Sequence, residues 1–292
     1  SVADGIQLTK TKEIIREDPD RKYIVVSAPG KRYEGDNKIT DILYLCKTHI
    51  EHNLPYDQLF QVVVDRYMAV EINLGVKVDL LKYFEEIREN LRKNPSADYV
   101  ASRGEYLNAV LVAAFLEYDF VDTANLIKFD EKGRLLTEET DKALAEELAK
   151  HERAVLPGFY GSTPDGEIKT FSRGGSDITG ALVARAVHAD VYENWTDVPG
   201  VLAADPALVQ RPAQVEQLRY EELQTLSRVG MQVLHEDAVA PVQRAQIPLR
   251  ICSTLEPETP GTLVRTQLEP GARQICFAGR RQLALLRLMG AE

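Results

Sequence analysis

The stretch Phe171-Ser172-Arg173-Gly174-Gly175-Ser176-Asp177 separates an expected strand from a long apolar helical run at 178–187. Two adjacent glycines let a backbone approach a ligand closely, and the start of the next helix offers unpaired N–H groups and a positive dipole end. The guanidinium of Arg173 adds a planar fork that suits a carboxylate or a phosphate. The stretch therefore predicts a site that holds anions beside a polar, charged ligand.

The same stretch also has a purely structural interpretation. Ser and Asp are favoured N-cap residues, so Gly174 to Asp177 is also typical of a tight turn that starts a helix. A single glycine-rich loop is weak evidence for a ligand site. The other motifs of the chain must decide between the two interpretations.

The composition is that of a globular protein. The chain has 292 residues, of which 44% are hydrophobic and 27% are charged, and its formal net charge is −10. The length allows one large domain or two of ordinary size. The acidic balance argues against nucleic acid and anionic membrane surfaces as partners.

Neither a membrane span nor a metal-ligand pattern is visible in the sequence. No apolar run reaches the ~18 residues that a membrane-spanning helix needs, and the sequence does not open with a signal-peptide pattern. The cysteines Cys46, Cys252 and Cys276 have no metal-like spacing. Reduced cysteines suit the cytoplasm, which is the expected location.

Expected strands alternate with expected helices along the chain. Helices are predicted over 5–17, from about 54 to 96, and over 106–116 and 137–150, and one begins at a cap formed by Thr40 or Asp41. Strands are predicted at 23–27, 153–156, 169–171, 190–195 and 247–252. This alternation predicts an α/β fold, a three-layer α/β/α sandwich with a mostly parallel central sheet.

Four motifs, in this order, resemble those of the aspartate kinases. They are Val26-Ser27-Ala28-Pro29-Gly30-Lys31, Ser102-Arg103-Gly104-Glu105, the stretch 171–177, and Trp195-Thr196-Asp197-Val198-Pro199-Gly200 continuing to Asp205-Pro206. The resemblance runs from the first residue to about 292. It implies the amino-acid kinase fold, with a helical insertion at about 54–98, and a cytoplasmic homodimer.

The resemblance also implies a reaction. It is transfer of the γ-phosphate of ATP, with Mg²⁺, to the side-chain carboxylate of L-aspartate, the first step towards lysine, threonine and methionine. Phosphoryl transfer mainly requires positioning and charge neutralisation. A carboxylate is already ionised at neutral pH, so it needs no general base. The motifs supply the glycine N–H groups and basic groups that such chemistry requires.

The resemblance assigns the aspartate pocket to two of the motifs and to Thr40. Arg173 is expected to bind the α-carboxylate and Glu105 the α-ammonium group, and Arg173 and Asp177 are the expected catalytic residues. The remaining expected substrate contacts are Thr40, Gly174, Gly175 and Ser176. Two alternatives stay open, because Ser102 and Glu105 also fit a capping box and Thr40 also fits an N-cap.

Nucleotide contacts are expected from three segments. Ser27 follows a strand at the edge where open α/β sheets bind ligands. Gly161 and Ser162 lie in a predicted loop whose backbone N–H groups would approach the phosphates. Thr196, Asp197 and Asp205 belong to the motif that resembles the nucleotide segment of the family. No protein ligand to a metal is assigned.

The sequence departs from the family pattern at several places. The family's first strand ends in Lys-Phe-Gly-Gly, and the given sequence starts at Ser1, just after that position. A polypeptide without that lysine is expected to lose most phosphoryl transfer and to keep part of its aspartate binding. Leu202, Ala207 and Gln232 stand where relatives commonly carry Tyr, Arg and Lys, which puts the details of nucleotide binding in doubt.

Two domains are expected. Residues 1–264 would form the catalytic domain, and 265–292 a linker with the start of an ACT-like regulatory domain, so feedback inhibition is not expected from these residues alone. Two other functions compete with aspartate phosphorylation. One is another acceptor for the same fold, such as glutamate, acetylglutamate, carbamate or UMP. The other is a ligand-binding fragment without catalysis.

Overall fold

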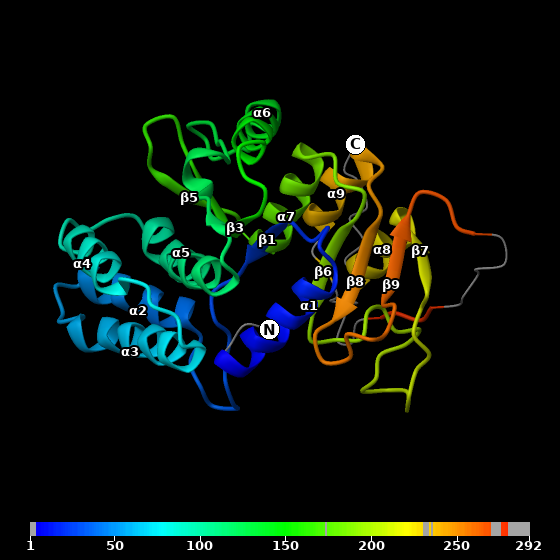
Figure 1. Cartoon of the computed structure of the whole chain (residues 1–292), viewed down its shortest axis with the longest axis horizontal. Coiled ribbons are helices and arrows are strands. Elements are labelled where there is room, and N and C mark those ends of the chain that lie inside the picture. The colour runs from blue at the N-terminus through cyan, green and yellow to red at the C-terminus, as the bar shows by residue number, and fades with distance from the viewer. Residues whose placement is uncertain (1–3, 173, 230–233, 235, 270–275, 280–292) are drawn as a thin grey trace, which may run out of the picture.

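A small parallel sheet forms the centre of the first half of the chain. Strand β3 (Ala154–Pro157) lies between β1 (Tyr23–Val26) and β2 (Asp119–Phe120), and both pairings are parallel. The computed structural model describes residues 4–172, 174–229, 234, 236–269 and 276–279. Figure 1 shows these strands between the helices of the N-terminal half and a second group of strands.

The two faces of β3 belong to two different hydrophobic cores. Val155 packs into one core, whereas Ala154 and Leu156 pack into the other. Side chains alternate between the faces of a strand, so a strand buried on both faces needs apolar residues at every position. The continuous apolar run of β3 therefore requires helices above and below it.

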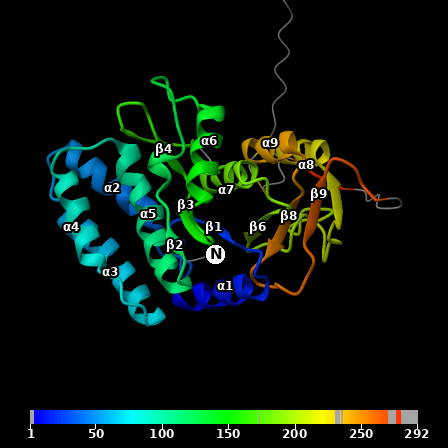
Figure 2. The same cartoon turned by 45° about the horizontal axis from the view of Figure 1, so that its top comes forward.

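Helices from the first half cover one face and helices from the second half the other. The first core contains residues of α1 (Gly5–Glu17), α2 (Ile39–Glu51), α3 (Asp57–Leu74), α4 (Leu80–Leu91) and α5 (Ala97–Leu116). The second contains residues of α6 (Thr137–Leu148), α7 (Gly175–Ala186), α8 (Tyr220–Arg228) and α9 (Glu236–Ala245). Figure 2 shows α7, α8 and α9 along one side of the strands and α1 along the other.

The second half of the chain builds a four-stranded sheet in the order β6-β8-β9-β7. Its strands are β6 (Tyr192–Thr196), β7 (Gln217–Arg219), β8 (Leu249–Ser253) and β9 (Thr262–Arg265). The β6–β8 and β7–β9 pairs are parallel and the β8–β9 pair is antiparallel. A separate antiparallel hairpin joins β4 (Tyr160–Ser162) to β5 (Ile168–Thr170).

The α/β class with mostly parallel strands is confirmed, but some local details differ from the expectation. The helix expected from 106 begins at Ala97, where the Ser96 hydroxyl caps it by accepting the Tyr99 N–H at 3.1 Å. The segment 160–162, expected in a loop, is strand β4. Arg173, Gln232 and most of the segment 265–292, expected to begin a regulatory domain, lie outside the described residues. Within the part of the chain that is described, no helix combines the length and the apolar character needed to cross a bilayer.

Candidate active site

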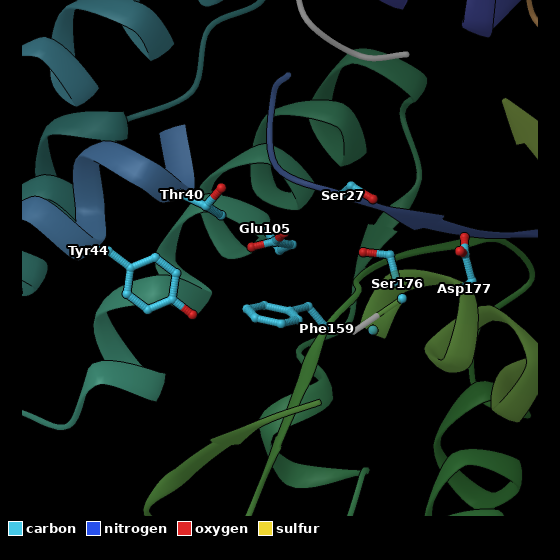
Figure 3. Close-up of a pocket in the computed structure, with 9 residues that line it drawn as sticks. Ser27, Thr40, Tyr44, Glu105, Phe159, Ser176 and Asp177 are labelled. Carbon is cyan, nitrogen blue, oxygen red and sulfur yellow. The ribbon is translucent and has the colours of Figure 1, made fainter. Parts of the chain in front are cut away.

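One pocket gathers residues from the sequence motifs. It encloses about 290 Å³ and is lined by Ser27, Thr40, Tyr44, Glu105, Phe159 and the run Gly174–Asp177. Figure 3 shows Thr40 and Tyr44 at one end, Ser176 and Asp177 at the other, and Glu105 between them. The pocket lies where the carboxyl end of β1, the helices α2 and α5 and the start of α7 meet, as expected for an α/β sheet.

The start of α7 is open to the pocket. Its N-cap is Gly174, which adopts the left-handed conformation (φ 58°) and supplies no side-chain cap. The backbone bond from the Ile178 N–H to the Gly174 carbonyl spans the first turn. The alternative that Ser176 or Asp177 is only the N-cap is therefore wrong, because both lie inside the helix. The first turn of α7 lines the pocket, and the unpaired N–H groups and positive dipole end of a helix N-terminus suit an anion.

Glycines allow Phe159 to pack against this turn. A Cβ on Gly175 would lie 2.6 Å from Cδ2 of Phe159, and one on Gly158 would lie 2.5 Å from the Ser176 hydroxyl oxygen. Phe159 itself has φ 83°, which is rare for a residue with a side chain, and its N–H donates to the Thr179 hydroxyl at 3.1 Å. Strained backbone of this kind concentrates at ligand sites. The strain here places the ring in the pocket wall.

Helix α2 contributes Thr40 and Tyr44 to the same wall. The helix starts at Ile39 after Lys38, which forms no side-chain cap, so the alternative that Thr40 is an N-cap is wrong. Residues four apart share a helix face, which explains why Tyr44 accompanies Thr40. Burial, with the carboxylates of Asp98 and Glu105, raises the pKa of Tyr44. The phenol therefore stays protonated and can donate a hydrogen bond into the pocket.

Glu105 is the most unusual ionisable group of the pocket. It lies in the middle of α5, so the capping-box alternative is wrong, and it is only 5% exposed. Its Oε2 atom is buried and has no hydrogen-bond partner in the part of the chain that the structure describes. Burial raises the pKa of Glu105 to about 7, and the backbone amides of Ala28 and Glu105 and the Arg103 charge oppose that rise. A buried carboxylate oxygen without a partner is a natural receptor for a ligand cation.

A buried ion pair fixes the loop that leads into α2. Arg66 Nη2 lies 2.7 Å from Asp36 Oδ2, and these side chains are 3% and 7% exposed. Arg66 Nη1 also donates to the Gly30 carbonyl at 3.3 Å. The hydrogen bond from Arg32 and the charge of Arg66 hold the pKa of Asp36 well below its usual range. The loop thereby presents Thr40 to the pocket in one position.

Replacing Asp36 by asparagine is expected to lower the free energy of unfolding by about 2 kcal/mol near neutral pH, because two arginines lose a charged acceptor. The native pKa of Asp36 is depressed, so this stabilisation is present above the unfolded pKa of about 3.9 and disappears as the pH falls below it. Urea titrations at neutral and acid pH measure both effects. Glu146→Gln, which breaks the exposed pair with Lys142, is the control and should change little. Equal losses in the two variants would contradict the prediction.

Three of the expected nucleotide residues lie at the end of β6 or beyond it, whereas Ser27 lines the pocket. Thr196 is the last residue of β6, and its hydroxyl donates to the Asp197 carboxylate at 3.3 Å. The Asp205 carboxylate accepts the Ala207 N–H at 2.8 Å, so it closes a local turn. None of these three lines the pocket that holds Glu105. Their contacts with a nucleotide stay predictions.

Gly161 and Ser162 are placed differently from the expectation. Both lie in strand β4, where the Ser162 N–H donates to the Ile127 carbonyl at 2.9 Å and its hydroxyl donates to the Ala124 carbonyl at 2.6 Å. A Cβ on Gly161 would lie 2.1 Å from the Ile127 carbonyl oxygen. Both residues therefore pack against neighbouring backbone in the hairpin. The segment 160–162 is therefore a strand and not a loop, and the phosphate contacts of Gly161 and Ser162 stay predictions.

Tyr44 and Phe159 also line the pocket, although they belong to none of the sequence motifs. The i, i+4 spacing from Thr40 could have indicated Tyr44. Phe159 lies beside Gly158, but the positive φ that turns its ring inward has no signature in the residue type. Arg173 lies outside the described residues, so its contact with a carboxylate stays a prediction.

Comparison with known proteins assigns the chain to a family. The family model described as "Amino acid kinase family" matches residues 1–253. The chain belongs to the amino acid kinase family. That model spans every residue that lines the pocket and strands β1 to β8.

Among members of the family, the chain is similar to aspartokinases. It is 38% identical to aspartokinase 3 of Bacillus subtilis over 284 residues, which cover 90% of this chain and 61% of that protein. The crystal structure of Clostridium acetobutylicum aspartate kinase superposes with a TM-score of 0.87 at 45% identity, covering 91% of this chain and 60% of that one. Escherichia coli aspartokinase III, at 24% identity and a TM-score of 0.78, shows the same fold. The chain thus spans about three fifths of the length of these relatives.

Proposed function

We propose that the chain carries the acceptor site of an ATP-dependent aspartate kinase, which phosphorylates the side-chain carboxylate of L-aspartate. The buried, unpartnered Oε2 of Glu105 supports this most directly, because an amino acid supplies the ammonium group that such an oxygen requires. The similarity to aspartokinases supports the same acceptor. Escherichia coli aspartokinase III, which shares the fold, has been crystallised with aspartate and ADP.

The pocket has complementary groups for both ends of an amino acid. Glu105 receives the α-ammonium group, and the open N-terminus of α7 with the Ser176 hydroxyl receives a carboxylate. We assign the α-carboxylate to Arg173 and the first turn of α7, as the family motif implies. The side-chain carboxylate then lies near Asp177 with its lone pairs free to attack. Positioning two anions together is the main task of the protein in such a reaction.

The nucleotide and its metal ion complete the proposal. We assign MgATP to the side of β6, with Ser27, Thr196, Asp197 and Asp205 as candidate contacts. Within the described residues, no three His, Cys, Asp or Glu side chains gather as a metal site. In this proposal Mg²⁺ would be held mainly through phosphate oxygens and waters, and it would neutralise charge on the transferring group. The homodimer and the cytoplasmic location stay predictions.

A panel of acceptors tests the function. ADP release by the natural full-length protein with L-aspartate, L-glutamate, acetylglutamate, carbamate and UMP is measured beside calorimetric binding of each acceptor. The proposal requires the highest kcat/KM and the tightest binding with L-aspartate. A higher kcat/KM with another acceptor would reassign the substrate. Binding of aspartate without any ADP release would instead favour a ligand-binding role.

The proposed role of Glu105 predicts a pH dependence of aspartate affinity. Because burial raises the pKa of this carboxyl to about 7, a growing share is protonated as the pH falls below 7. The protonated form cannot pair with an ammonium group. The dissociation constant for aspartate should therefore rise about tenfold per pH unit below about 7. Calorimetric titrations at several pH values measure it, and a constant affinity from acid to mildly alkaline pH would contradict it.

A further inference from the structure

A hydrogen-bond network ties Asp177 to strand β6. Asn194 Nδ2 donates to Asp177 Oδ1 at 2.9 Å and lies 3.3 Å from the Tyr192 hydroxyl oxygen. That hydroxyl donates to the Asp177 backbone carbonyl at 3.1 Å. Two side chains of one strand thus hold both the carboxylate and the main chain of a pocket residue. The residues that line the pocket include Asp177 but neither Asn194 nor Tyr192.

Gly180 makes this network possible. A Cβ at Gly180 would lie 2.6 Å from the Tyr192 hydroxyl oxygen and 2.8 Å from two of its ring carbons. Glycine inside a helix costs about 1 kcal/mol relative to alanine, so its place in α7 requires a reason. The reason is the tyrosine ring, which reaches Asp177 through the space that Gly180 leaves. Burial and the Asp177 charge raise the pKa of Tyr192, so its hydroxyl stays a donor.

The same strand leads to the expected nucleotide residues. Asn194 and Thr196 are two positions apart on β6, so their side chains share one face of the strand. Parallel pairing with β8 through the whole of β6 fixes the position of the strand. A carboxylate held by Asn194 is therefore placed relative to the nucleotide side as well as to the acceptor pocket.

We propose that Asn194 is a positioning residue, whose amide fixes the Asp177 carboxylate between the acceptor pocket and the nucleotide side of β6. The inference rests on the proposed function, because it gives Asp177 its task beside the transferring phosphoryl group. Asn194 does not reach the substrate, so its effect belongs to the geometry of the transfer step and not to aspartate binding. Small displacements at such sites have large kinetic consequences.

The test separates kcat from affinity. Asn194→Ala is expected to lower kcat for aspartate phosphorylation by roughly tenfold to a hundredfold, while the dissociation constant for aspartate changes less than about threefold. Asp141→Ala is the matched control. It removes the ion pair between Arg185 and Asp141 (2.7 Å) at the far end of α7 and should leave both constants near the wild-type values. A wild-type kcat in Asn194→Ala, or a loss confined to affinity, overturns the inference.

Asn194→Asp gives a signature that a merely structural role would not produce. An ionised Asp at this position cannot donate and repels Asp177, whereas the protonated acid can donate as the amide does. Its kcat relative to wild type should therefore rise as the pH falls from about 8 to about 6. A ratio that stays constant over this range counts against the inference. If Asn194→Ala does not fold, Tyr192→Phe, which removes the hydrogen bonds of the Tyr192 hydroxyl, replaces it. Tyr192→Phe should lower kcat to a smaller extent and leave the dissociation constant for aspartate nearly unchanged, and an unchanged kcat would overturn the inference.

Crystal structures decide the inference independently of turnover. In Asn194→Ala the Asp177 carboxylate should leave the position it has in the wild-type crystal, and an unchanged carboxylate overturns the inference. If the wild-type protein transfers no phosphoryl group to aspartate, the proposed function fails. The displacement of Asp177 in the crystals still shows whether Asn194 positions it.

Discussion

Replacing Glu105 by glutamine is expected to weaken L-aspartate binding by about a hundredfold or more. The carboxylate is 5% exposed and its Oε2 has no hydrogen-bond partner among the described residues. A ligand ammonium group would therefore form a buried, charge-assisted hydrogen bond there. Loss of one partner from such a pair costs about 3–5 kcal/mol, and each 1.4 kcal/mol is a factor of about ten. Calorimetric titration with aspartate measures the loss.

Asp98→Asn is the matched control for this variant. Asp98 also carries a carboxylate on α5 near Tyr44, but it is already bonded to Lys169 at 2.9 Å and Thr170 at 2.6 Å. It is not among the residues that line the pocket. Its neutralisation should change aspartate affinity little. Similar losses in both variants would mean that general negative charge, and not the Glu105 carboxylate, attracts the ligand.

Glu105→Gln should also stabilise the folded protein in the absence of ligand. The folded pKa of Glu105 is raised above its unfolded value of about 4.3, so its contribution to stability is complete below that value and is lost as the pH rises through about 7. Glutamine carries no such pH dependence. Above pH 7, Glu105→Gln should therefore unfold at higher denaturant concentration than the wild type. Higher stability with lower affinity is the expected trade-off for a binding residue.

The sequence motifs identified most of the pocket because α/β topology brings distant segments together. Ser27 follows β1, Thr40 lies in the first turn of the next helix, and the run 174–177 forms the N-cap and first turn of α7, so all three meet at one edge of the sheet. Their residue types also carry the chemistry. The glycines, the hydroxyl and the carboxylate of the run 174–177 indicate a polar ligand site from the sequence alone.

Other features had no clear local signal. Ser102 and Glu105 have the spacing of a capping box, although they lie inside α5. The true N-cap is Ser96, and the residue three positions later is Tyr99 instead of the Glu or Gln of a capping box. The local pattern therefore favoured the wrong helix start. The β4 strand is short, and its pairing with β5 depends on tertiary contacts with the Ile127 segment. Local propensity cannot resolve such contacts. This is why Gly161 and Ser162 were expected in a loop and lie in a strand.

Gly161→Ala is expected to lower the free energy of unfolding by about 3 kcal/mol, because the new methyl group enters a filled space. Its Cβ would lie 2.1 Å from the Ile127 carbonyl oxygen and 2.6 Å from the Ile127 Cβ. The carbonyl cannot turn away freely, since it accepts the Ser162 N–H at 2.9 Å. For a protein of this size the melting temperature should fall by about 6–10 °C, which calorimetry or denaturant titration measures.

Gly166→Ala separates this clash from backbone strain. Gly166 lies at the turn of the same hairpin with φ 81°, and a Cβ there would meet nothing within 4 Å. Its substitution strains only the local backbone and should cost about 1 kcal/mol. If Gly161→Ala lowered the free energy of unfolding no more than Gly166→Ala, the Ile127 segment would be able to move away from the new methyl group. The hairpin would then not be the rigid support that Phe159, directly before β4, requires to keep its ring in the pocket wall.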